Sequence, residues 1–143
     1  MKKILISACL IGDKVNYKGE GKYQPSVKKL LEKYELVPFC PEVQGGMSIP
    51  RKPSEIRGDK VIHEDGTDVT ENFNSGARKA LNLCKALNIK IAVLKENSPS
   101  CGTHFIHDGL FQDRLIPGLG VTAKLLKENG ITVYSEKEID ILI

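Results

Sequence analysis

The sequence predicts an α/β fold in which a mainly parallel sheet is covered by helices on both faces. The first observation is a set of short, continuous apolar runs, such as residues 4–6 and 89–94, which are typical of strands buried on both faces. The second is that segments with apolar residues at helical spacing separate these runs. Strands that alternate with helices form right-handed βαβ units. We therefore expect a three-layer, Rossmann-like domain with small β-hairpin insertions.

In the amino-terminal half, a helix is expected over residues 25–34, because Pro25 suits a first helical position and apolar residues follow it at helical spacing. Residues 36–39 form the next apolar run, and Pro38 within it favours an edge strand. Residues 41–59 show no periodicity. A loop of this length in a compact domain is usually functional or disordered, so we expect it to cover a substrate.

The carboxyl-terminal half contains two expected β-hairpins, each marked by an Asp-Gly pair: Asp65-Gly66 and Asp108-Gly109. Helices with one apolar face and buried strands make up the rest, at residues 73–87, 89–94, 121–129 and 131–134. Ser135 and Glu138 have the spacing of a capping box, which predicts a short terminal helix.

Length and composition limit the class of protein. The chain has 143 residues, 41% of them hydrophobic, which suits a single domain over residues 1–143. Lys and Arg number 21 against 18 Asp and Glu, too small a surplus for the clustered basic face of a dedicated nucleic-acid binder. No run approaches the roughly 18 to 20 apolar residues that span a bilayer. Four cysteines are too few for a secreted disulfide scaffold, so we expect reduced thiols and a cytoplasmic location.

Three of the four cysteines follow predicted strands. Cys9, Cys40 and Cys101 each come directly after an apolar run, whereas Cys84 lies on the apolar face of a helix. In open α/β sheets, ligands bind beyond the carboxyl ends of the strands. A single cysteine is most often a small buried hydrophobe, but three at the same topological position favour a shared site. We expect these three thiols to meet there and assign Cys84 to the core.

The residues alone leave the identity of the metal open. Three thiolates with a free fourth position suit a metal that binds substrate. Zinc is one alternative, because His104 follows Cys101 at ligand-like spacing and would complete a Cys₃His set. An iron–sulfur cluster is the other, since sulfur-only ligation suits it equally.

Distinctive short motifs surround the three cysteines and also occur in the predicted loops: Ser7-Ala8-Cys9-Leu10, Cys40-Pro41-Glu42-Val43, Ile49-Pro50-Arg51, Gly66-Thr67-Asp68-Val69-Thr70, Ser98-Pro99-Ser100-Cys101-Gly102, Asp108-Gly109 and Pro117-Gly118-Leu119-Gly120-Val121-Thr122. Through these motifs, the sequence resembles a bacterial family known as DUF523 over nearly the whole chain.

Some relatives in that family are thiouracil desulfidases. The resemblance therefore implies an enzyme that removes sulfur from a thiolated nucleobase such as 2-thiouracil, or from a similar thiocarbonyl compound, and releases sulfide. It implies that Cys9, Cys40 and Cys101 hold a [4Fe-4S] cluster with one iron free of protein. In the family's proposed non-redox route, the thiocarbonyl sulfur binds this iron, water attacks the adjacent carbon, and the sulfur departs on the cluster.

Such a water attack requires a general base, and Glu42, two residues after Cys40, is the expected one. Ser98 is expected to relay a proton, and Ser100, Arg51 and Asn97 are expected to bind the substrate through hydrogen bonds. Thr122, near the start of a late helix, is expected to be structural although its helix terminus faces the crevice.

Two other hypotheses come from the residues. In the first, the protein is a non-catalytic zinc or iron–sulfur binding or sensing module that recruits a partner through the loop after Cys40. In the second, it is a component of transfer-RNA thiolation, a role for which the small surplus of basic residues is the only indication. The leading expectation is an enzyme with a small-molecule substrate and neither a membrane nor a nucleic acid as partner.

Overall fold

The computed structural model describes residues 1–143 and contains a four-stranded parallel sheet. Its strands lie in the order β2 (Tyr34–Phe39), β1 (Lys2–Ser7), β5 (Ile91–Leu94) and β8 (Thr132–Ser135). The chain adds β2 on one side of β1 and the later strands of this sheet, β5 and β8, on the other side. The strand order therefore reverses between β1 and β5, and ligands of open α/β sheets bind at such a switch point.

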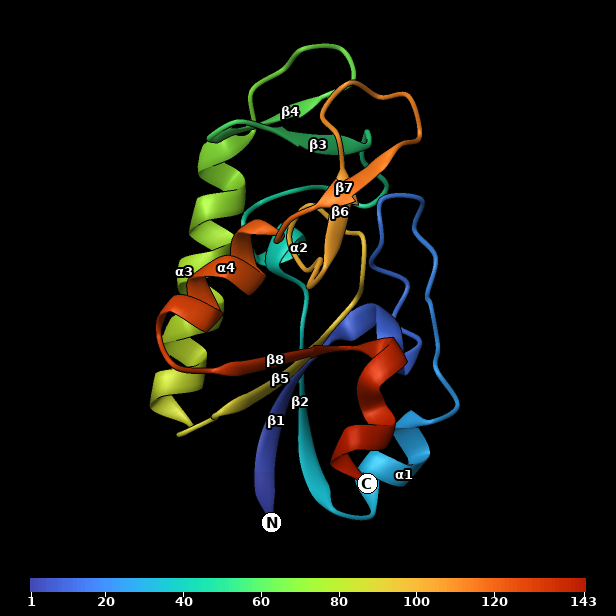
Figure 1. The fold of residues 1–143 in the computed structure, drawn as a ribbon, viewed down its shortest axis with the longest axis vertical. Helices are drawn as coiled ribbons and strands as arrows, with labels where there is room; N and C mark the ends of the chain where they lie inside the picture. The colour runs from blue at the N-terminus through green and yellow to red at the C-terminus, as the bar shows by residue number, and fades with distance from the viewer.

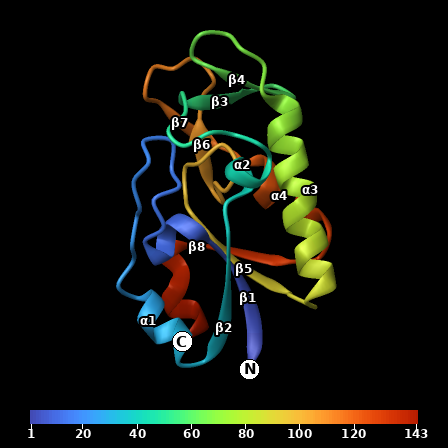
Figure 2. The same ribbon diagram turned by 180° about the vertical axis from the view of Figure 1, so that it is seen from behind.

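Helices cover both faces of the sheet, as Figures 1 and 2 show. The helices α3 (Thr70–Ala86) and α4 (Val121–Glu128) lie on one face, and α1 (Val27–Leu31) lies on the other with the terminal 3₁₀ helix η2 (Glu136–Leu142). Side chains of β1 alternate between the faces: Ile4 and Ile6 pack toward α1 and η2, and Leu5 packs toward α3 and α4. The predicted three-layer α/β architecture is confirmed.

Two antiparallel hairpins lie beyond the carboxyl ends of the parallel strands, at the top of Figure 1. The first pairs β3 (Ser54–Arg57) with β4 (Lys60–His63), and the second pairs β6 (Phe105–His107) with β7 (Leu115–Pro117). The predicted hairpin insertions are therefore present. They place a second group of loops above the edge of the sheet at which the parallel strands end.

Residues 41–59 were expected to lack regular structure, and this prediction is wrong. They contain the short helix α2 (Pro41–Gln44) and strand β3, and Gly58 and Asp59 connect β3 to β4. The turn at Asp65-Gly66 exists, but the chain returning from it forms only the isolated bridge between Ile62 and Asp68. A pair of Asp and Gly residues lies on each side of β4. The earlier pair, Gly58 and Asp59, forms the turn of the hairpin, because β3, the strand that pairs with β4, precedes it in the chain.

The first helix is shorter than the predicted 25–34. Helix α1 ends at Leu31, and Tyr34 instead begins β2 opposite Lys2. The reason is tertiary: β2 pairs with all six residues of β1, which requires the strand to begin at Tyr34. Strand β2 is an edge strand, as Pro38 indicated. None of the helices combines the length and apolar character that crossing a membrane requires.

The terminal segment starts at the predicted capping box. The Ser135 hydroxyl accepts the Lys137 N–H at 3.1 Å, and the Glu138 carboxylate accepts the Ser135 N–H at 2.9 Å. The segment that follows is a 3₁₀ helix, η2, which packs Ile139 against the sheet.

Candidate metal and substrate site

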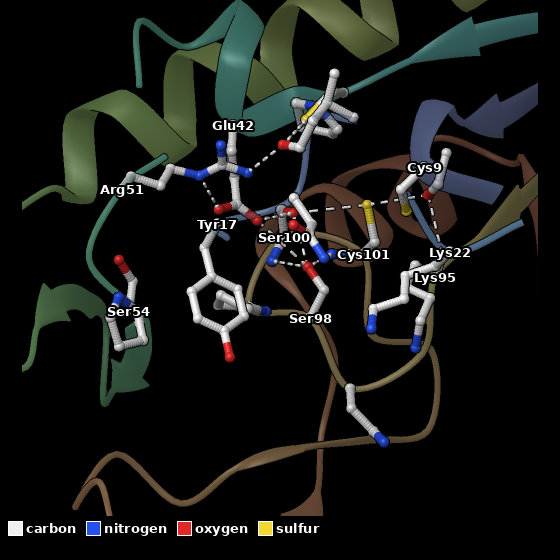
Figure 3. Close-up of a pocket in the computed structure, with 18 of the residues that line it drawn as sticks. Cys9, Tyr17, Lys22, Glu42, Arg51, Ser54, Lys95, Ser98, Ser100 and Cys101 are labelled. Carbon is white, nitrogen blue, oxygen red and sulfur yellow. Dashed lines mark hydrogen bonds and ion pairs between the residues drawn. The ribbon is translucent and has the colours of Figure 1, made fainter. Parts of the chain in front are cut away.

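A cavity of about 390 Å³ lies at the carboxyl edge of the sheet. The ends of β1, β2 and β5 form one side of it, and residues of the hairpins and of the loop between β1 and α1 form the others. Figure 3 shows labelled residues from several of these segments around this space, among them Cys9, Tyr17, Ser54, Lys95 and Cys101. The cavity thus occupies the switch point of the sheet, where a ligand is expected.

Cys9, Cys40 and Cys101 all line this cavity. Cys9 lies in the 3₁₀ helix η1 (Ala8–Ile11) that directly follows β1, and Cys40 lies between β2 and α2. Cys101 lies in the turn after β5, where the Ser98 hydroxyl accepts its backbone N–H at 3.1 Å. Cys84 lies on the buried face of α3, packs in the core and does not line the cavity.

The three thiols affect one another electrostatically. Burial raises the pKa of Cys9 to about 11, with further raising by Cys40 and lowering by Lys95. Burial also raises the pKa of Cys101 to about 12; hydrogen bonds from Ser7 and Ser100 oppose this, and Cys9 and Cys40 add to it. Burial likewise raises the pKa of Cys40. Three thiolates are unfavourable here without a cation, so a bound metal group would have to displace their protons.

The donor set fits an iron–sulfur cluster better than a single metal ion. No three His, Cys, Asp or Glu side chains lie close enough together to hold one ion. In a cluster, each cysteine binds a different iron atom, so the thiols can stand farther apart. The zinc alternative also required His104, which does not line the cavity and whose Nδ1 lies 2.9 Å from Glu96 Oε2.

Glu42 and Arg51 form a buried ion pair beside the thiols (Figure 3). Arg51 Nε donates to Glu42 Oε1 at 3.0 Å, and the side chains are only 4% and 13% exposed, respectively. The other Arg51 nitrogens donate to the carbonyls of Ser48, at 3.1 Å, and Val15, at 2.9 Å. Arg51 lines the cavity, as the substrate-binding prediction requires, but its hydrogen bonds hold Glu42 and the surrounding loops.

The second oxygen of Glu42 faces two serine hydroxyls. Ser100 Oγ donates to Glu42 Oε2 at 2.8 Å, Ser98 Oγ lies 3.4 Å from the same oxygen, and 2.9 Å separates the two hydroxyls. Ser98 also accepts the backbone N–H groups of Ser100 and Cys101, both at 3.1 Å. Ser98 therefore stabilises the turn, and Ser100 has the closer contact with the carboxylate.

The last two residues considered from sequence differ in placement. Asn97 lines the cavity with a left-handed backbone, φ +69°. Thr122 is fully buried near the start of α4, does not line the cavity, and its hydroxyl has no hydrogen-bond partner.

Sequence reasoning missed Ser7 and Glu96. The buried Ser7 hydroxyl donates to Cys101 Sγ at 3.3 Å and accepts the Lys95 N–H at 2.9 Å. Glu96, only 5% exposed, binds backbone N–H groups of the loop that carries Cys101. A polar residue at the end of an apolar strand is the available signal for Ser7. Glu96 has no comparable signal, because its partners are recognisable only in the folded chain.

Comparison with known proteins shows the family to which the chain belongs. The sequence matches the 2-thiouracil desulfurase family over residues 4–138. It is 42% identical over 147 aligned positions to "uncharacterized protein YbbK" of Bacillus subtilis (strain 168), covering 96% of this chain and 97% of that one. The fold superposes with a TM-score of 0.95 and 43% identity on the "[4Fe-4S]-dependent thiouracil desulfidase TudS (DUF523Vcz)", covering 99% of this chain and 95% of that one. This chain belongs to the 2-thiouracil desulfurase family.

Proposed function

We propose that this protein is a [4Fe-4S]-dependent desulfidase that acts on a thiolated pyrimidine such as 2-thiouracil and releases sulfide. The observation that carries the proposal is the cavity itself, where thiols from three strand ends lie beside a buried carboxylate with hydroxyl partners. Membership of the 2-thiouracil desulfurase family and the close likeness to a [4Fe-4S]-dependent thiouracil desulfidase support it.

Cys9, Cys40 and Cys101 would hold the cluster, and the chain offers no fourth cysteine to the cavity. When bound by these three thiolates, the cluster would supply a Lewis-acidic iron as an acceptor for the substrate sulfur. Ser7 supports one ligand, since its hydroxyl donates to Cys101 Sγ at 3.3 Å, whereas the Ser100 hydroxyl, 3.6 Å from the same sulfur, donates its proton to Glu42. Such hydrogen bonds to a ligand sulfur orient it and tune the metal group.

Glu42 is proposed as the general base that takes a proton from the attacking water. Arg51 fixes one carboxylate oxygen, which leaves the other directed at the serine pair. Ser100 is the nearer hydroxyl and can return the proton toward the ring of the substrate, while Ser98 both touches Ser100 and holds the turn. The relay that was predicted at Ser98 stays a prediction. We propose that the hydroxyls of Ser98 and Ser100 act in it together.

The substrate is proposed to be a small molecule. A cavity of about 390 Å³ lies within the range of ligand pockets, roughly 300 to 1,000 Å³. A non-catalytic sensing module would need the thiols, but it would not need a buried base and two hydroxyls beside them. The geometry therefore favours the enzyme over the sensing module.

The test is anaerobic reconstitution with iron and sulfide, followed by incubation with 2-thiouracil. We expect broad visible absorption from the cluster and equimolar release of sulfide and uracil. Cys84→Ala is the matched control, because this thiol lies in the core, and it should retain iron and turnover. Cys101→Ala should lose both. A protein that assembles the cluster but releases no sulfide from any thiolated pyrimidine would contradict the proposed activity.

A further inference from the structure

One side of the cavity is built by hairpin residues instead of strand ends. Glu55 of β3, His107 of β6 and Phe111 of the β6–β7 loop line it. Figure 3 shows Ser54, which precedes Glu55, on the Arg51 side of the cavity, with Cys9 and Cys101 on the opposite side and Glu42 between them. A substrate with its sulfur toward the thiols therefore directs the rest of its ring toward the hairpins.

Glu55 is a buried carboxylate, only 8% exposed. Its Oε1 accepts the backbone N–H groups of Gly109, at 2.9 Å, and Phe111, at 3.1 Å. No Lys, Arg or His forms an ion pair with it. The nearby Arg57 instead donates two hydrogen bonds to the Gly109 carbonyl, at 3.0 and 2.6 Å. One oxygen of Glu55 thus anchors the loop, and its charge has no cation partner.

The other oxygen of Glu55 has no protein partner but is open to the cavity. No hydrogen bond reaches Oε2, yet the buried polar side-chain atoms without a partner are only His107 Nδ1 and Thr122 Oγ1. Oε2 is therefore not sealed in the interior, and the cavity is the space that Glu55 lines. A mostly buried carboxylate oxygen is costly unless a donor reaches it. A ligand in the cavity can provide that donor.

Phe111, whose backbone N–H donates to Oε1 of the same carboxylate, also lines the cavity. It has a left-handed backbone, φ +54°, which is rare for a bulky residue. Such conformations occur mainly at functional sites, where the surrounding structure holds them in place. Gly109 allows the close approach, since a Cβ there would lie 2.5 Å from the Ile56 carbonyl oxygen. Glu55 and Arg57 bind the loop in this position. The hairpins thus present a hydrogen-bond acceptor and an aromatic ring to the same cavity.

We propose that Glu55 Oε2 accepts a ring N–H of the substrate while Phe111 contacts the ring. This rests on the proposed function and narrows its substrate class to flat thiocarbonyl heterocycles that carry a free N–H, such as unsubstituted thiolated pyrimidine bases. An N-methyl group at that ring position removes the donor and collides with the carboxylate. Glu55 is thus a specificity-determining residue on the side of the cavity away from the reacting sulfur.

The variant Glu55→Gln tests this with little change in shape. Since the Oε1 position accepts two backbone N–H groups, the amide oxygen occupies it, and the NH₂ group takes the place of Oε2. The loop stays anchored, but an acceptor becomes a donor. Arg57→Lys is the matched control, because it weakens the same loop and Arg57 does not line the cavity.

The experiment compares kcat/KM for 2-thiouracil with that for its N1-methyl and N3-methyl derivatives, using reconstituted protein. Binding of uracil and the two N-methyluracils, measured by calorimetry, gives a readout that does not depend on turnover. We expect the wild type to disfavour one methyl derivative by about 10- to 100-fold, as for loss of a hydrogen bond to a charged group. Glu55→Gln should lose this preference, mainly through KM, and Arg57→Lys should keep it.

The outcomes separate the two proposals. Wild-type protein that releases sulfide from 2-thiouracil, with equal preference in wild type and Glu55→Gln, overturns the role of Glu55 but leaves the desulfidase proposal standing. If the wild type shows no turnover but binds uracil in a way that depends on Glu55, the desulfidase proposal is overturned and the role of Glu55 stands. Equal effects of Glu55→Gln and Arg57→Lys would assign Glu55 to loop anchoring alone, and failure of the wild type to bind any uracil also overturns the inference.

Discussion

Glu42 and Glu96 are both buried beside the cavity, but they differ in the kind of donor that surrounds them. Glu96 Oε1 accepts the backbone N–H groups of Asn97, Thr103 and His104, at 3.1, 2.8 and 3.0 Å. Its Oε2 accepts the Thr103 hydroxyl at 2.7 Å and lies 2.9 Å from His104 Nδ1. The Glu42 carboxylate accepts no backbone N–H; its partners are Arg51 and the hydroxyls of Ser98 and Ser100.

This difference shows how the hydrogen-bond donors around a buried carboxylate determine its role. Backbone N–H groups are fixed by the chain, so Glu96 holds the loop of Cys101 in one shape. Hydroxyl groups rotate and exchange their protons, so Glu42 can take up and pass on a proton without moving the backbone. Glu96 is thus suited to structure and Glu42 to acid–base chemistry.

The largest expected effect is that of Glu42→Gln on turnover. The amide retains the shape of the side chain but cannot act as a base, so kcat for sulfide release should fall by about 10²- to 10⁴-fold. Iron content and thermal stability should stay near wild type. Sulfide release within a few-fold of wild type would remove Glu42 from the chemistry and abolish the contrast with Glu96.

Glu96→Ala should act mainly on stability. It leaves several N–H groups of the 97–105 loop without an acceptor, and we expect the free energy of unfolding to fall by about 3 kcal/mol. Denaturant unfolding of the apoprotein measures this directly. Glu42→Gln is the comparison and should cost less, because the amide oxygen still accepts the Arg51 Nε–H and no buried group loses its partner. Equal losses for the two variants would contradict the division of roles.

Ser100→Ala and Ser98→Ala sharpen the comparison within the serine pair. Ser100 Oγ is the closer donor to Glu42, so its loss should lower kcat by about 10- to 100-fold with normal iron content. Ser98 Oγ accepts two backbone N–H groups, so its loss should destabilise the Cys101 turn by about 1 kcal/mol and reduce iron retention. Iron analysis beside steady-state kinetics distinguishes the two, and a reversed pattern would make Ser98 the relay.

The smallest expected effect is a pH dependence that belongs to Glu96. Burial alone would raise its pKa, but hydrogen bonds from the backbone of His104 and from Thr103 outweigh burial and hold the pKa well below its ordinary value of 4.5. A lowered pKa in the folded state stabilises the protein above pH 4.5, and this contribution is lost as the pH falls further. The difference in unfolding free energy between wild type and Glu96→Gln should therefore shrink below pH 4.5. A constant difference would contradict this.

The strands that position the three cysteines could be predicted from the sequence, because they depend on local patterns. The apolar runs that end before Cys9, Cys40 and Cys101 identify strands, and parallel strands bring their carboxyl ends to one edge. Topology then brings the three cysteines to one cavity. The core position of Cys84 was likewise readable from the apolar spacing of its helix.

The contacts within the site depend on pairs that are distant in sequence, so no local pattern reveals them. Ser7 and Cys101 are 94 residues apart, and Glu55 and Gly109 are 54 apart. The early end of α1 has the same origin, because the pairing of Tyr34 with Lys2 overrides the helical spacing of that segment. Long-range packing thus decided the early end of α1 and hid the role of Ser7. Glu96 was missed for another reason: its partners Asn97, Thr103 and His104 lie within eight residues along the chain, but no sequence pattern marks them.

Arg51 binds more than the carboxylate beside it. Its backbone N–H donates to the Tyr17 carbonyl at 2.8 Å, and its side chain donates to the Val15 carbonyl at 2.9 Å. Displacing residues 15–17 would therefore break both bonds and weaken the support of Glu42. The position of this loop and the orientation of the proposed base are thus coupled through one arginine side chain.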